Sequence, residues 1–109
     1  MSRNVAATLL LALPLAMAAT SVMAAQTYIS TKWVESTLPM DECLGRAAAA
    51  IRDAGGWGKV LNTPDARHGL RGLFTSQVRC VPEMKIVIFV VAGPSNTTAK
   101  YVDEIADHF

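Results

Sequence analysis

The chain has 109 residues, of which 51% are hydrophobic and 17% are charged, and its formal net charge is +1. Nucleic-acid binding depends on neutralising phosphates with clustered Lys and Arg, so this near-neutral composition argues against a nucleic-acid partner. The same balance argues against electrostatic attachment to a membrane surface, and the length suits one small domain rather than two.

Residues 1–24 have the pattern of a secretory signal peptide. Arg3 gives a positive start, an apolar run extends from Val5 to Ala19, and small residues precede a cleavage point after Ala24. A membrane-spanning helix is the alternative, but the run is about fifteen residues long and a span needs roughly twenty. No basic cluster follows to hold a stable membrane anchor. We expect a bacterial protein that is periplasmic or secreted, with a single domain over residues 25–109.

The mature chain begins with a predicted strand and a predicted helix. In residues 26–36, Ile29, Thr31 and Trp33 alternate with a second set of side chains, which is typical of a strand. A helix is predicted over residues 40–54, because apolar residues recur there at spacings of three and four. Pro39 suits its first turn, and Gly55-Gly56 ends it.

The middle of the chain is predicted to hold a short strand and a long loop. Residues 57–61 could form the strand, although Gly58 weakens it. Turn-forming residues then dominate from Asn62 to Asp65, and the loop is expected to continue to about Gly72.

Two adjacent strands and a terminal helix complete the prediction. Residues 73–81 alternate as a half-exposed strand does, and the continuous apolar run over 86–92 indicates a central strand. The short connection between them favours an antiparallel hairpin. Gly93-Pro94 ends the second strand, and a helix follows whose expected buried stripe is Ala99, Val102, Ile105, Ala106 and Phe109.

The two cysteines, Cys43 and Cys80, are predicted to form a disulfide. Cys43 lies on the apolar stripe of the first helix, and Cys80 lies on the same strand face as Phe74 and Val78. An even number of cysteines in a small exported domain favours a structural bridge. A redox pair is the alternative, but rapid thiol exchange usually uses exposed cysteines at Cys-x-x-Cys spacing.

The elements together predict an α+β fold. Their order is strand-helix-strand-strand-strand-helix, with a mainly antiparallel sheet of three to four strands and both helices on one face. A ferredoxin-like arrangement without its last strand is one such fold, although the pattern does not determine the strand order.

This layout resembles small exported bacterial α+β proteins of an uncharacterised family. The resemblance lies in Cys43 in the first helix, Cys80 in a strand, and Phe89-Val90-Val91-Ala92-Gly93-Pro94 before a terminal helix. It covers most of the mature chain and implies an exported α+β domain. It contains no diagnostic functional motif, so it assigns no active residue.

The segment 65–72 is the one cluster that suggests ligand chemistry. Arg67, His68 and Arg71 could gather around an anionic ligand, because guanidinium groups match carboxylates and phosphates. A solvated loop is the simpler interpretation. Asp65 and His68 could form an acid–base pair, but no nucleophile or oxyanion donor accompanies them. No metal-binding or cofactor motif is recognisable, and we expect no catalytic residues.

Aromatic residues are the remaining candidates for partner binding. Trp33 and Trp57 are expected in the core, because a small domain usually buries such side chains, whereas Tyr28 is expected to be exposed. The expected function is that of an exported, non-enzymatic binding or interaction module stabilised by a disulfide. A small periplasmic hydrolase or thiol-redox protein is the alternative. The expected partner is a protein or small ligand of the cell envelope, and the expected oligomeric state is a monomer or weak homodimer.

Overall fold

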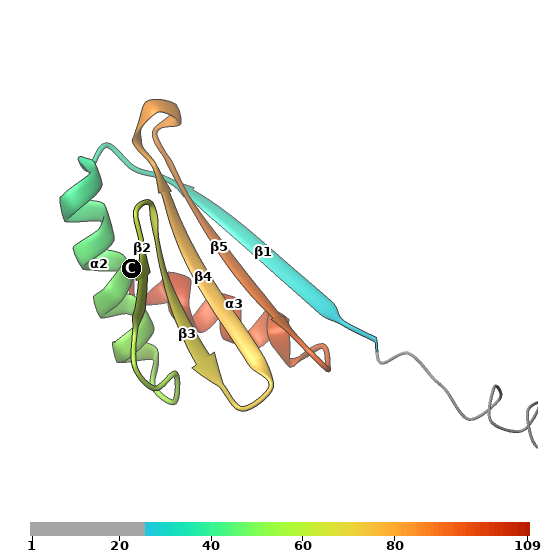
Figure 1. Cartoon of the computed structure of the whole chain (residues 1–109). Coiled ribbons are helices and arrows are strands. Elements are labelled where there is room, and N and C mark those ends of the chain that lie inside the picture. The colour runs from blue at the N-terminus through green and yellow to red at the C-terminus, as the bar shows by residue number, and fades with distance from the viewer. Residues whose placement is uncertain (1–25) are drawn as a thin grey trace, which may run out of the picture.

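A computed structural model describes residues 26–109 (Figure 1). The predicted signal peptide, residues 1–24, lies outside these described residues. The elements in chain order are β1 (Tyr28–Glu35), α2 (Met40–Ala54), β2 (Leu61–Thr63), β3 (Ala66–Arg71), β4 (Phe74–Val81), the short 3-10 helix η1 (Pro82–Met84), β5 (Ile86–Gly93) and α3 (Thr97–Asp107).

The strands of the described chain form one five-stranded sheet in the order β1-β5-β4-β3-β2. Every neighbouring pair is antiparallel. The β4–β5 hairpin is confirmed, and so is the inner position of β5, which lies between β1 and β4 (Figure 1). The α+β class and the antiparallel sheet are therefore as predicted.

The predicted number of strands was too low, because residues 66–71 are not a loop. They form β3, which pairs with β2 on one side and with β4 on the other. The segment Ala-Arg-His-Gly-Leu-Arg has weak strand propensity, and pairing with two neighbours overrides that propensity. The short strand expected over 57–61 is displaced to Leu61–Thr63.

The first predicted helix is confirmed with its bounds, Met40–Ala54. Asp41 and Glu42 lie in its first turn, where negative charge complements the positive end of the helix dipole. The helix ends at Gly55, whose φ of 81° suits glycine much better than other residues.

Both helices of the described chain cover the same face of the sheet. The side chains that face them on β4 and β5 are those of Ser76, Val78, Cys80, Val87, Phe89 and Val91, and all are buried. Ile51 of α2 and Ile105 of α3 pack into this layer. The core of the domain therefore lies between one sheet face and the two helices.

The predicted disulfide joins Cys43 of α2 to Cys80 of β4. The two Cα atoms are 6.2 Å apart, and both residues belong to the buried core. The bridge therefore connects a helix to the sheet through the core. No helix among the described residues 26–109 is long and apolar enough to cross a membrane.

The buried stripe of α3 differs from the prediction at one position. Val102 and Ile105 are buried as expected, but Ala99 is exposed and Thr98 is buried in its place. The Thr98 hydroxyl is 2.8 Å from the Ser30 hydroxyl of β1, so the buried polar group has a hydrogen-bond partner.

Candidate interaction surface

The three residues of the predicted anion site lie on β3 and do not point in one direction. Arg67 pairs with Val78, which faces the helices, whereas His68 pairs with Gln77 on the opposite face. Successive side chains of a strand point to opposite faces, so β3 separates His68 from the two arginines. Arg67 and Arg71 share a face but are four residues apart, about 13 Å along an extended strand.

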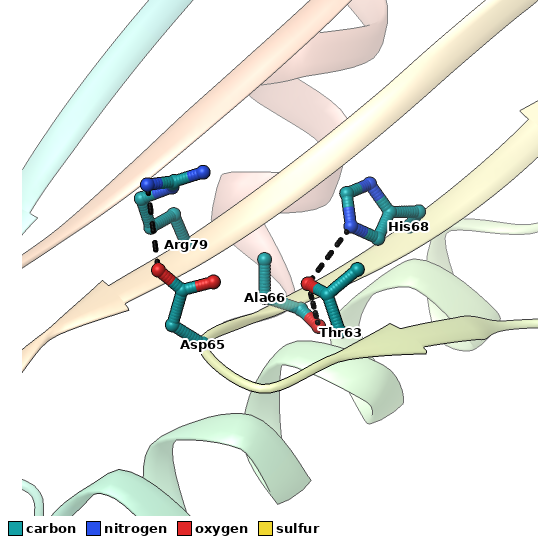
Figure 2. A network of polar contacts seen from close by, with 5 residues as sticks. All are labelled: Thr63, Asp65, Ala66, His68 and Arg79. Atoms are coloured by element: carbon teal, nitrogen blue, oxygen red, sulfur yellow. Dashed lines mark hydrogen bonds and ion pairs between the residues drawn. The ribbon is translucent and has the colours of Figure 1, made fainter.

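Asp65 and His68 also have separate partners (Figure 2). The Asp65 carboxylate is 3.3 Å from Arg79 Nη1, and the His68 Nε2 atom is 3.2 Å from the Thr63 hydroxyl. Thr63 in turn donates to the carbonyl of Ala66 over 3.3 Å. The structure therefore does not pair Asp65 with His68 as a general acid–base pair would require.

Each arginine of the predicted site contacts backbone carbonyls. Arg67 Nη1 donates to the carbonyl oxygens of Thr63 and Ala66, both at 2.9 Å, and so braces the β2–β3 turn. Arg71 Nη1 donates to Gly55 over 3.2 Å, and its guanidinium lies 4.3 Å from the centre of the Tyr101 ring. Both side chains thus have structural roles, and anion binding by Arg67, His68 and Arg71 stays a prediction.

A redox role for the cysteines has little geometric support. Cys43 and Cys80 are buried in the core and bonded to each other, whereas a sulfur that exchanges with a partner has to be reached by that partner's thiolate. Among residues 26–109, no three His, Cys, Asp or Glu side chains are grouped so that they could hold a metal ion.

The largest unexplained feature is the sheet face opposite the helices, which we call the open face. On β5 it carries Ile86, Ile88, Val90 and Ala92, which alternate with the buried residues of the core and are only half-buried. On the edge strand β1 it carries Ile29, Thr31, Trp33 and Glu35. No helix of the described chain covers this face.

Trp33 is the most prominent side chain of the open face. It is 63% exposed and pairs across the strands with Ile88. An open hollow of about 360 Å³ is lined by Thr31, Lys32, Trp33, Ile86 and Ile88. A second hollow of about 460 Å³ is lined by Trp33, Glu35, Ser36, Thr37, Met84, Lys85 and Ile86. Trp33 and Ile86 thus separate two adjacent depressions at the end of the sheet near η1.

The remainder of the open face is more polar. On β4 it carries Thr75, Gln77, Arg79 and Val81, and on β3 it carries His68 and Leu70. The β1–β5 part is therefore apolar around Trp33, and the β4–β3 part supplies amide, guanidinium and imidazole groups. An apolar centre beside polar groups is the usual arrangement of a protein-binding patch.

The expectation for the aromatic residues was correct in two cases and wrong in one. Trp57 is 1% exposed, and Tyr28 is 41% exposed, as predicted. Trp33 was expected in the core, but β1 is an edge strand and its odd-numbered residues lie on the open face. One signal in the sequence could have indicated this surface, because the 86–92 run is apolar on both faces of its strand.

Comparison of the chain with protein-family models and with curated proteins finds no match.

Proposed function

We propose that this protein is an exported, non-enzymatic interaction module that binds a partner protein through the apolar part of its open face. The single observation that carries the proposal is that β5 is apolar on both faces, while the described helices cover only one. A strand with apolar residues on both faces normally lies between two covering layers. A partner would supply the second layer.

The residues around Trp33 support a protein partner. Tryptophan is enriched among the residues that dominate binding energy, because its large ring removes much apolar area from water when a partner covers it. Ile86 and Ile88 line the first hollow together with Trp33, and Glu35 and Lys85 are among the residues that line the second. This combination favours a partner with an apolar protrusion surrounded by polar groups.

The alternative of a hydrolase or thiol-redox protein has weaker support. It would use Asp65 with His68, or Cys43 with Cys80, but the first pair is divided between different partners and the second is buried. Export is supported by the signal-peptide pattern and by a disulfide, which persists in oxidising compartments.

Photocrosslinking in bacterial cells tests the proposal. Benzoylphenylalanine is placed at position 33 of the full chain, and the products are identified by mass spectrometry. The matched control carries the same group at Asp53, which is exposed on α2 away from the open face. We expect a crosslink to a different protein from position 33 and none from position 53. Identical products from both positions, or none to a different protein, would contradict the proposal.

A second pair of variants tests the site itself. Ile88→Ser in the chain that carries the crosslinker at position 33 should reduce the yield of the heterologous crosslink, because it removes apolar contact area beside Trp33. Leu73→Ser is the control, because Leu73 is also an exposed apolar residue but lies in the turn between β3 and β4. Equal loss with both variants would show that general hydrophobicity, rather than the open face, drives binding.

A further inference from the structure

The two edges of the sheet differ in their ability to accept another strand. At one edge, β2 has only three residues and is followed by Pro64, and short strands and prolines both hinder further pairing. At the other edge, β1 has eight residues in continuous register with β5, from Tyr28 opposite Gly93 to Glu35 opposite Ile86. Within residues 26–109 no strand pairs with the outer side of β1.

The register determines which backbone groups of β1 point outward. Ser36 donates its N–H to Lys85, which continues the β1–β5 ladder by one residue. In an antiparallel ladder the N–H and C=O of a residue point to the same side, and that side alternates along the strand. Even-numbered residues of β1 therefore bond to β5. The N–H and C=O groups of Ile29, Thr31, Trp33 and Glu35 point to the free edge.

β1 also lacks two of the features that usually protect an edge strand. Its sequence contains no proline, and its register with β5 shows no bulge. Its single cation, Lys32, is on the helix side of the sheet, where its Nζ lies 3.3 Å from Asp103 of α3. The outward-pointing stretch from Ile29 to Trp33 therefore carries no charged side chain on the open face.

We infer that β1 pairs antiparallel with β1 of a second copy of this chain, with the two-fold axis passing between the two Thr31 residues. This register places Thr31 opposite Thr31 and Ile29 opposite Trp33 of the partner, all with outward backbone groups. Each such pair exchanges two N–H to C=O hydrogen bonds. On the open face, the apolar side chains of Ile29 and Trp33 meet across the boundary between copies.

The charges on β1 select this register over its neighbour. A shift of the two-fold axis by one residue would place Lys32 opposite Lys32, which is unfavourable because the like charges would face each other directly. In the Thr31-centred register Lys32 lies opposite Ser30, and Tyr28 lies opposite Val34. A shift of the axis by one residue toward the N-terminus would remove Trp33 and Val34 from the paired region of β1.

Pairing of the two copies would extend the sheet and join their open faces. Ile29 and Trp33 are 65% and 63% exposed, so each has much apolar surface left to cover. Pairing along one edge strand buries less than the roughly 1,200 Å² typical of stable complexes, so a weak, concentration-dependent dimer is expected. The inference rests on the backbone and register of β1, and so it does not depend on the proposed binding of a different protein.

Charge variants at position 31 test the inference by sedimentation velocity on the purified protein. Thr31→Lys and Thr31→Glu should each weaken the dimer at least about tenfold, because each places two like charges at the centre of the interface. An equimolar mixture of the two variants should recover the dimer, because only a pairing of position 31 with itself brings Lys and Glu together. Thr75→Lys is the matched control: Thr75 is an exposed threonine of the same face, but on the inner strand β4.

The outcomes are distinct. A wild-type protein that dimerises, single variants that do not, and a mixture that does would together support the inference. A wild-type protein that stays monomeric at every concentration would overturn it, and so would a Thr31→Lys variant that dimerises as well as Thr75→Lys. Circular dichroism confirms that each variant is folded. Recovery of the dimer in the mixture is a second control, because a misfolded variant could not pair. Ile88→Ser should leave the dimer unchanged, which separates this result from the crosslinking experiment.

Discussion

The guanidinium carbon of Arg71 lies 4.3 Å from the centre of the Tyr101 ring, so the last residue of β3 contacts α3. The same guanidinium donates to the carbonyl of Gly55, the residue that ends α2. Tyr101 itself makes edge-to-face contacts with Trp57 and Phe74. Arg71 therefore joins three segments that are far apart in the sequence, and it closes one end of the core.

Replacement of Arg71 should reduce stability more than replacement of Arg67. Arg71→Ala removes a cation–π contact, a hydrogen bond and the packing of the aliphatic stem, and should lower the free energy of unfolding by about 1–2 kcal/mol. Arg67→Ala removes hydrogen bonds within one turn and should cost about 0.5–1 kcal/mol. Urea unfolding of the two variants measures the difference. An equal loss of unfolding free energy in the two variants would show that the contact of Arg71 with Tyr101 adds nothing to stability.

Loss of the disulfide should destabilise the domain strongly. Cys43 and Cys80 are 37 residues apart, and closing a loop of that length stabilises the folded state by roughly 4 kcal/mol in the chain-entropy treatment. The double variant Cys43→Ala, Cys80→Ala should lose this amount in thermal or urea unfolding. Wild-type protein unfolded in the presence of a reductant is the control and should behave like the double variant. A double variant with wild-type stability would refute this prediction.

Two glycine-to-alanine changes should have opposite effects. A Cβ atom on Gly69 would lie 2.9 Å from Ile51 Cγ2 and 3.0 Å from Trp57 Cβ, so Gly69→Ala should cost about 1–3 kcal/mol through overpacking. Gly45 lies on an exposed position of α2 with nothing within 4 Å of the added atom. Gly45→Ala should therefore stabilise the protein by about 0.5–1 kcal/mol, because alanine favours the helix. Chemical denaturation measures the free energy of unfolding of both variants. A change of the same sign in the two variants would contradict the packing described here.

The two tryptophans should differ in their access to solvent. Trp33 is largely exposed and Trp57 is buried, so iodide should quench the fluorescence of the first and leave the second almost unaffected. Trp33→Phe should remove the quenchable component, and Trp57→Phe should retain it. Because Trp33 is outside the core, Trp33→Phe should change the free energy of unfolding by less than about 0.5 kcal/mol. Quenching that persists in Trp33→Phe would place Trp57 at the surface.

The parts of the fold that local patterns determine were predictable. The helix over Met40–Ala54 and the hairpin of β4 and β5 follow from apolar periodicity and from the short connection between the strands. Cys43 and Cys80 could be paired in advance because each falls on the buried side of its own element. In each case the residues of the helix or strand itself, and those directly beside it in the sequence, are enough to predict the structure.

The parts that depend on strand order were not predictable. Residues 66–71 become a strand only because β2 and β4 flank them, and their own composition favours a loop. Trp33 and Trp57 are both large aromatic residues in short apolar segments, and only the position of β1 at the sheet edge exposes the first. The interaction surface is therefore a property of the assembled sheet and not of any one segment.

The pairing of β1 with β5 sets the order in which the sheet can be completed. Residues 28–35 and their partners 86–93 are far apart in the sequence, so this pairing has to close a long loop. The neighbouring strands β3 and β4 are close in sequence and can pair by closing only a short turn. The strand that comes first in the chain is therefore expected to be among the last to join the sheet.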